Sequence, residues 1–280
     1  MNSVQTMRTT APVKTYIGPD SSRMVGALLR EQGVDSVLIV TDKNIEAAGL
    51  LAGVEDSLRT AGCSFIVYDE TPADPPDTAV DRMCALCWEK RCQAVIAVGG
   101  GSCIDSGKCV AFMQRNPGRI RDYLLDPTLP RRKGVPFIAI PTTSGTGSEV
   151  TFGVVITDSQ SGRKIGAGGP EFFASAGILD PLLTVGLPRS VTASTAMDAF
   201  AHAVESMLSG KSNPTCRLFA GEAVRLISGN LEAVLSNGQD VSRRQHLMYA
   251  AYLAAMSVND GSCSLGHSIA HVLGAHYHIP

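Results

Sequence analysis

The segment AVIAVGGGSCIDSGK, residues 94–108, decides the fold of this chain. Its apolar residues 94–98 predict a strand that is buried on both faces of a parallel sheet. Three glycines follow and let the backbone approach a ligand closely, while the next helix presents unpaired N–H groups and the positive end of its dipole. Gly99, Gly100, Gly101 and Ser102 therefore favour a diphosphate site over a tight turn without a ligand.

The segments around this turn extend the same alternation of strands and helices. Ile104 stands where the G-x-G-x-x-G fingerprint requires a glycine, so the turn alone does not identify a known motif. Alternating strands and helices are typical of an α/β fold with a Rossmann-like parallel sheet. Short apolar runs predict strands at residues 37–40, 64–68, 136–140, 154–157 and 178–179, and helical spacing predicts helices at residues 21–32, 44–51 and 77–89.

A second polar loop, PTTSGTGSE at residues 141–149, follows the strand predicted at residues 136–140. Ligands of open α/β sheets bind outside the carboxyl ends of the strands. Because both loops leave carboxyl ends of strands, we expect them to converge at one sheet edge. Two such loops have the geometry that a dinucleotide needs.

Asp42 lies two residues after the strand predicted at residues 37–40, which ends in Thr41-Asp42-Lys43. An acidic side chain there can accept hydrogen bonds from an adenosine ribose and repel a 2′-phosphate, which favours NAD over NADP. Asp is also a common N-cap and could simply cap the helix at residues 44–51. On its own, the sequence supports both roles about equally.

The composition changes after Leu187 to a helical pattern rich in Ala, Leu and Met. We therefore predict an α/β domain at residues 1–187 and an all-helical domain at residues 188–280. Helical spacing predicts helices in the second domain at residues 194–209, 216–228, 243–258 and 265–277.

Two of these helices carry side chains that can bind a metal. Asp198 and His202 are four residues apart, as are His267 and His271, so each pair shares one helical face. A carboxylate with neutral imidazoles suits Fe(II) or Zn(II) better than Mg²⁺ or Ca²⁺, and the sequence leaves iron and zinc open. Either pair alone is more often an ordinary helix with a hydrogen-bonded histidine.

Composition excludes several classes of protein. With 280 residues, 44% apolar and 18% charged, the chain can form two ordered domains. The net charge of −2 argues against a nucleic-acid or anionic-membrane partner. No apolar run approaches the roughly 20 residues that span a bilayer, so we expect a soluble cytoplasmic protein. We interpret the eight cysteines, including the cluster Cys84, Cys87 and Cys92, as reduced core thiols.

Taken together, the motifs resemble the iron-dependent (group III) alcohol dehydrogenases over the whole chain. The shared segments are Asp42, GGGSCIDSGK, PTTSGTGSE, LDPLLTVGLP, MDAFAHAVES and GHSIAHVLGAHYHIP, in the order of that family. The resemblance implies an NAD-binding domain and a helical domain, with metal and nicotinamide in the cleft between them. It also implies a homo-oligomer, with a dimer formed through an N-terminal strand.

The resemblance assigns roles to individual residues. Asp42 would hold the adenosine ribose, and Gly99 to Ser102 the pyrophosphate, with Asp105 nearby. Lys164 would approach the nicotinamide ribose, and His271 matches an active-site histidine beside the nicotinamide. The nicotinamide half would be surrounded by Thr142, Thr143, Ser144 and Thr146, and the metal would be held by Asp198, His202 and His267.

Two positions depart from the family pattern. Ser144 stands where alanine is more frequent, a small change. The fourth ligand of the family is a histidine directly after the proline of Y-x-x-P, and here that proline is Pro280, the last residue. We therefore expect weakened metal binding, with His276 and His278 as less favoured substitutes.

The implied activity is reversible hydride transfer between NAD and a small primary alcohol or diol, hence an alcohol dehydrogenase or aldehyde reductase. Two alternatives remain. One keeps the fold with other chemistry, as in the metal-free maleylacetate reductases or the dehydroquinate synthases, the latter requiring more basic residues. The other is a truncated NAD-binding protein without catalysis.

Overall fold

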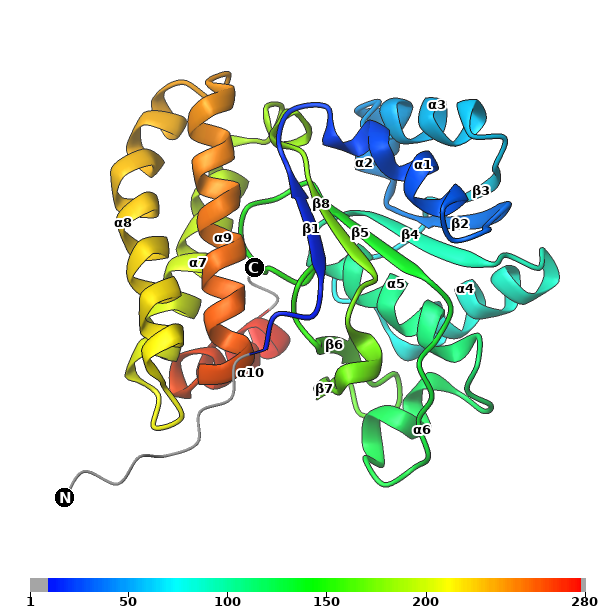
Figure 1. Cartoon of the computed structure of the whole chain (residues 1–280). Coiled ribbons are helices and arrows are strands. Elements are labelled where there is room, and N and C mark those ends of the chain that lie inside the picture. Colours follow the sequence, from blue (N-terminus) through cyan, green and yellow to red (C-terminus); the bar gives the residue numbers. More distant parts are fainter. Residues whose placement is uncertain (1–9, 278–280) are drawn as a thin grey trace.

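The computed structural model describes residues 10–277, which form a six-stranded parallel sheet beside a bundle of helices (Figure 1). The strand order is β1-β8-β5-β4-β2-β3. The strands are β1 (Lys14–Ile17), β2 (Ser36–Val40), β3 (Ser64–Tyr68), β4 (Ala94–Gly99), β5 (Phe137–Pro141) and β8 (Ala176–Leu179). The predicted α/β class and five of these strands are confirmed. The short strand β1 was missed, because its extended conformation depends on parallel pairing with β8 and not on an apolar pattern of its own.

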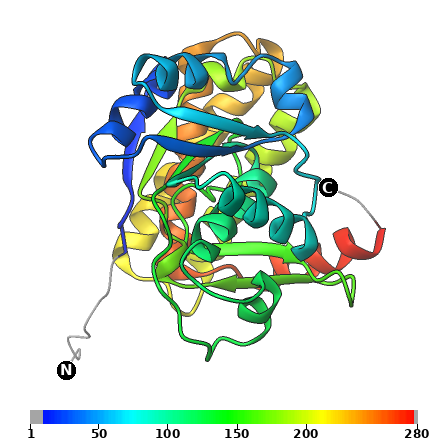
Figure 2. The same cartoon turned by 90° about the vertical axis from the view of Figure 1, so that its right-hand side faces the viewer.

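Alternate residues of each strand point to opposite faces of the sheet, so the sheet has a core on both sides. Helices cover both faces (Figure 2). Val37 and Ile39 of β2 pack with α1 (Val25–Arg30) and α3 (Ala52–Thr60). Leu38 and Val40 face the other core. That core contains residues of α4 (Asp77–Glu89), α5 (Gly101–Met113) and α6 (Ile120–Leu125).

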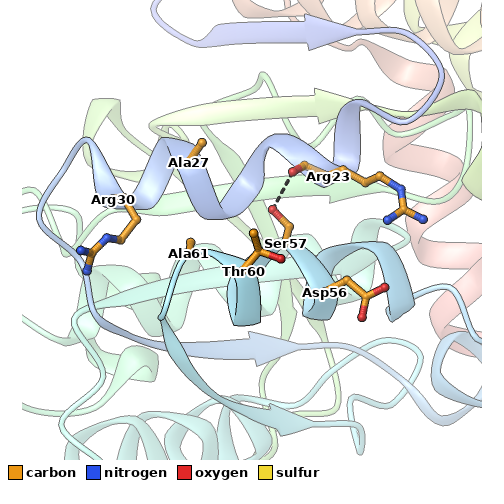
Figure 3. Close-up of a pocket in the computed structure, with 7 residues that line it drawn as sticks. All are labelled: Arg23, Ala27, Arg30, Asp56, Ser57, Thr60 and Ala61. Atoms are coloured by element: carbon orange, nitrogen blue, oxygen red, sulfur yellow. Dashed lines mark hydrogen bonds between the residues drawn. The ribbon is translucent and has the colours of Figure 1, made fainter.

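Helices α1 and α3 lie unusually close on the outer side of the sheet. A Cβ on Gly26 would lie 2.3 Å from the carbonyl oxygen of Ser57, so only glycine fits at this crossing. The Ser57 hydroxyl donates to the carbonyl of Arg23 at 2.6 Å (Figure 3). It also accepts from the Gly26 N–H at 3.0 Å. A shallow hollow of about 410 Å³ borders this crossing, and none of the site residues expected from the sequence lines it.

The strand predicted at residues 154–157 lies outside the main sheet. It is β6 (Gly153–Thr157), which pairs antiparallel with β7 (Lys164–Gly168) in a separate two-stranded sheet. Its residues alternate between buried and half-buried, as expected for a strand with one covered face. Lys164 starts the second strand of this hairpin.

The C-terminal part is helical, as predicted, and consists of α7 (Arg189–Leu208), α8 (Pro214–Ser236), α9 (Val241–Gly261) and α10 (Leu265–Tyr277). The first three pack against one another through small buried side chains, such as Ala203, Ala223 and Ala254, which allow a close approach of the helices. In Figure 1 these three stand beside the sheet. Helix α7 begins next to the predicted domain boundary; the division at residues 187 and 188 itself stays a prediction.

The remaining elements are short connections. They comprise α2 (Lys43–Ala47) and the 3-10 turns η1 (Ser21–Met24), η2 (Pro170–Phe172) and η3 (Pro181–Thr184). All eight cysteines are free thiols, and seven of them are buried. Within residues 10–277, no helix has the length and apolar character that crossing a membrane requires.

The threonine loop, residues 141–149, connects the sheet to the helical bundle. A Cβ on Gly145 would lie 2.7 Å from the Cβ of Thr195 on α7, and one on Gly147 only 2.1 Å from the Cβ of Ala255 on α9. Both glycines therefore permit contacts that a side chain would prevent. The loop is clamped between the two parts of the molecule.

Candidate functional site

The glycine turn, residues 99–102, lies where the chain changes the direction in which it adds strands to the sheet. From β2 the chain moves outward to β3, returns to β4 and then continues to β5 on the other side. Crevices form at the carboxyl ends of strands at such a switch point, here between β2 and β4. Asp42 follows β2 and Gly99 ends β4, so both lie at this crevice.

Asp42 serves partly as the cap that the sequence allowed. Its Oδ1 accepts hydrogen bonds from the backbone N–H groups of Asn44 (2.8 Å) and Ile45 (3.1 Å) and so caps α2. Its Oδ2 lies 3.6 Å from Sγ of Cys103, on the side of Gly99. One carboxylate therefore caps a helix with one oxygen and presents the other at the glycine turn.

The glycine turn and the threonine loop converge, as the sequence predicted. A Cβ on Gly100 would lie 3.8 Å from Cγ2 of Thr143, and one on Gly101 only 2.9 Å from Cγ2 of Thr146. The N–H of Thr142 donates to the carbonyl of Gly99 at 3.0 Å and holds the two together. Bare backbone at the start of α5 thus faces a wall of hydroxyl side chains.

Asp105 and Lys108 fasten α5 to the β6–β7 hairpin. Oδ2 of Asp105 accepts from the N–H of Val155 (2.8 Å), and Nζ of Lys108 donates to the carbonyl of Gly153 (2.7 Å). The two charges lie 3.7 Å apart and are almost fully buried. Burial raises the pKa of Asp105 and lowers that of Lys108, while their mutual attraction opposes both shifts.

A carboxylate and two imidazoles meet between α7 and α10. Asp198 and His202 share one face of α7, and Oδ2 of Asp198 lies 3.8 Å from Nδ1 of His202. His267 on α10 places its Nε2 3.4 Å from Oδ1 of Asp198. The two histidine rings stack with centroids 4.3 Å apart. The three predicted metal ligands therefore converge although 69 residues separate the first from the last.

Glu205 holds this cluster in place. It lies seven residues after Asp198 and accepts hydrogen bonds from Nδ1 of His267 (2.8 Å) and from N and Oγ of Ser264 (2.6 and 2.8 Å). Partial burial raises the pKa of Glu205, but these hydrogen bonds outweigh it and lower that pKa to about 2. The hydrogen bond to Asp198, helped by Glu205, raises the pKa of His267.

Cys263 joins the same cluster from the turn between α9 and α10. One ligand atom each from His202, Cys263 and His267 all lie within 4.8 Å of one another. Burial, with smaller contributions from the charges of Glu205 and Asp198, raises the pKa of the Cys263 thiol to about 12. The cluster therefore contains a soft sulfur donor in addition to the expected oxygen and nitrogen donors.

A single cavity of about 640 Å³ joins the glycine turn to this cluster. Lys164 also lines it, with its Nζ 2.7 Å from Oδ1 of Asp74. Thr142 and Ser144 are instead buried within the threonine loop. The predicted site residues that line the cavity are Gly101, Ser102, Asp105, Thr146, Lys164, Asp198, His202 and His267.

The side chain of His271, the expected active-site histidine, lies outside the described residues. Glu205 and Cys263 were missed in the sequence. Glu205 had a signal, because Asp198, His202 and Glu205 recur at one helical face over two turns. Cys263 had none, since it precedes α10 and belongs to no helical pattern with the histidines.

A switch-point crevice and a carboxylate and imidazole cluster, joined by one cavity, form an arrangement that suits a metal-assisted, dinucleotide-dependent oxidoreductase. Comparison with known proteins agrees. The sequence model of the family described as iron-containing alcohol dehydrogenase matches residues 12–181. The C-terminal model of the Fe-containing alcohol dehydrogenase family matches residues 192–280. The chain therefore belongs to the iron-containing alcohol dehydrogenase family.

Individual relatives cover nearly the whole chain. An NAD-dependent methanol dehydrogenase of Bacillus methanolicus is 35% identical over 96% of the chain and 70% of its own length. A 1,3-propanediol dehydrogenase of Klebsiella pneumoniae is 34% identical, with 96% and 70% covered. Among solved structures, a 1,3-propanediol oxidoreductase has a TM-score of 0.95 at 33% identity, with 99% of this chain and 72% of that chain covered. Sulfoacetaldehyde reductase from Bifidobacterium kashiwanohense in complex with NAD⁺ has a TM-score of 0.93 at 28% identity, with 99% and 73% covered.

Proposed function

We propose that this protein interconverts a small primary alcohol or diol and its aldehyde with NAD, using Fe(II) or Zn(II). The observation that carries the proposal is the shared cavity, which has the glycine turn at one end and Asp198, His202 and His267 at the other. A cofactor and a metal-bound substrate can meet there without a change of fold. The names of the relatives support the substrate class.

The dinucleotide fits the chain at three places. Gly99, Gly100, Gly101 and Ser102 would hold the pyrophosphate, because bare backbone and the first N–H groups of α5 face the crevice. Oδ2 of Asp42 would accept from the adenosine ribose and repel a 2′-phosphate. The nicotinamide half would lie along the threonine loop (Thr142, Thr143, Ser144 and Thr146) towards Lys164.

The donor set also fits a divalent metal. Because Glu205 accepts from Nδ1 of His267, that ring keeps its proton on Nδ1 and leaves Nε2 for a cation beside Asp198. Such outer hydrogen bonds fix the tautomer and orientation of metal-binding histidines. The metal supplies Lewis acidity and NAD accepts or donates the hydride when both are bound. His271 would relay the alcohol proton towards solvent.

The proposal is tested with purified, metal-stripped protein to which Fe(II) or Zn(II) is added back. We expect NADH absorbance to appear with short alcohols or diols and to disappear with the matching aldehydes, each only when metal is present. Turnover without metal would favour the reductase alternative. Dinucleotide binding without turnover, with either metal and every substrate, would favour a binding protein.

Two further assignments stay predictions. We propose a homodimer, since β1 is an edge strand that, among residues 10–277, pairs with β8 alone, and such edges readily pair with another chain. Light scattering across a concentration series measures the assembly. A cytoplasmic location would be checked by fractionation of the source cells.

A further inference from the structure

Cys263 differs from the other seven cysteines of the chain. Those seven are buried, and Cys263 alone is half-buried and lines the large cavity. Its sulfur, one ring nitrogen of His202 and one ring nitrogen of His267 all lie within 4.8 Å of one another. The thiol is therefore placed where it could act as a donor together with both imidazoles.

The backbone around Cys263 is held firmly. Ser262, directly before it, has φ 66° and ψ 158°, a conformation that is essentially restricted to glycine and costs about 1–3 kcal/mol. Two contacts maintain it: the N–H of Ser262 donates to the carbonyl of Val258 (2.8 Å), and Glu205 accepts from the N–H of Ser264 (2.6 Å). Residues on both sides of Cys263 are thus fixed, Ser262 to α9 and Ser264 to α7.

The spacing of these donors suits one small cation. Zn–S bonds are about 2.3 Å and Zn–N bonds about 2.0–2.1 Å, so donors in a tetrahedral site lie roughly 3.5 Å apart. The donor atoms of His202, Cys263 and His267 lie within 4.8 Å of one another, so they would have to close by roughly 1 Å to reach this separation. Asp198 is already within 3.8 Å of both rings.

We propose that Cys263 is an additional protein ligand of the metal held by Asp198, His202 and His267, an inference that rests on the metal site of the proposed function. On binding, the S–H bond breaks, the proton goes to solvent and the sulfur bonds to the cation. The thiolate and the Asp198 carboxylate together neutralise a divalent charge. A soft sulfur donor favours Zn(II) and Fe(II) over Mg²⁺ and Mn²⁺.

The test uses the whole protein loaded with Zn(II) for X-ray absorption and with Co(II) for optical spectra. In the wild type we expect a sulfur scatterer at about 2.3 Å from zinc and a near-ultraviolet sulfur-to-cobalt charge-transfer band. Cys263→Ser should lose both signals and bind zinc at least roughly 10–100-fold more weakly. That range is typical when a residue that only hydrogen-bonds to a metal ligand is mutated, and loss of a direct ligand should cost no less. Cys216→Ser is the matched control, because that thiol is buried among the same helices, bonded to the carbonyls of Ser206 and Ser257 (3.4 Å each), and should keep both signals.

The outcomes separate the two proposals. Bound zinc with only nitrogen and oxygen neighbours in the wild type overturns the role of Cys263 and leaves the metal site standing. Absence of bound metal overturns both. The wild-type absorption spectrum decides even where Cys263→Ser does not fold, since it needs no variant.

Discussion

At the scale of single residues, the geometry of the candidate site depends on hydrogen bonds that fix the orientation of its side chains. Glu205 fixes His267 by a hydrogen bond at 2.8 Å and fixes Ser264 by two more. Asp42 similarly divides its two oxygens between a helix cap and the glycine turn. In both cases a hydrogen bond to a neighbouring group fixes the orientation of a side chain of the candidate site.

His267→Ala is the sharpest test at this scale. It removes an imidazole from the cluster of Asp198, His202 and His267, which lines the same cavity as Gly101 and Ser102 of the glycine turn. We expect kcat/KM to fall by at least roughly 100-fold, because metal charge stabilisation contributes several kcal/mol and each 1.36 kcal/mol is tenfold in rate. The Kd of NAD, measured by calorimetry, should stay within about twofold, given that each tenfold is about 1.4 kcal/mol.

The control is His246→Ala, which removes an exposed imidazole on α9 that contacts Asn230. It should leave both quantities unchanged. Equal loss of NAD binding and turnover in His267→Ala would show that the dinucleotide and metal sites are not separate.

At the scale of elements, the threonine loop is the connection on which the cavity depends. It carries hydroxyls towards the glycine turn and two glycines towards the helices. Gly147 has φ +61° and no room for a side chain beside Ala255. A change there alters the seating of the loop on α9 and leaves the sheet intact.

Gly147→Ala is expected to lower the free energy of unfolding by the strain of a left-handed residue, about 1–2 kcal/mol, plus about 1–3 kcal/mol of overpacking. Gly162→Ala is the matched control: its φ is +68°, but nothing lies within 4 Å of the added Cβ. It should therefore show only the strain. Urea unfolding measures both variants, and equal losses would mean that the loop does not press on α9.

At the scale of the whole molecule, the junction between sheet and bundle buries a carboxyl. Glu149 ends the threonine loop, is 3% exposed and packs against Gly177 of β8. Burial raises its pKa from 4.5 to about 7, partly offset by its own backbone N–H and the charge of Lys108. Ionising Glu149 therefore acts against the assembled structure.

The raised pKa fixes the sign of a pH effect. The folded protein binds the Glu149 proton more tightly than the unfolded chain does, so this contribution to stability is complete below about pH 4.5 and is lost as pH rises through about 7. A shift from 4.5 to about 7 corresponds to about 3 kcal/mol. Glu149→Gln has no such titration. As pH rises from about 5 to about 8, its free energy of unfolding should therefore increase by about 3 kcal/mol relative to that of the wild type.

Urea unfolding of both proteins across this pH range provides the measurement. Taking the difference between the two proteins cancels the titration of all other groups. Parallel stability curves would contradict the burial of an ionisable Glu149.

The sequence by itself determined the α/β class, most of the strands and the helical C-terminal part. These follow from local patterns: apolar runs such as residues 94–98, and helical spacing such as that around Asp198 and His202. The glycine turn and the threonine loop could also be placed at one edge, because carboxyl ends of parallel strands share an edge. The resemblance of the motifs to a family supplied the ligand set.

Only the tertiary structure decided which groups meet across the chain. Strand β1 exists because β8 pairs with it, and residues 153–157 leave the main sheet because β7 pairs with them. Cys263 and His267 meet Asp198, His202 and Glu205 because α10 folds back on α7, a contact that no local pattern encodes. The periodicity of apolar residues indicates which face of a segment is buried. Which other segment covers that face is decided by packing between parts of the chain that are distant in sequence.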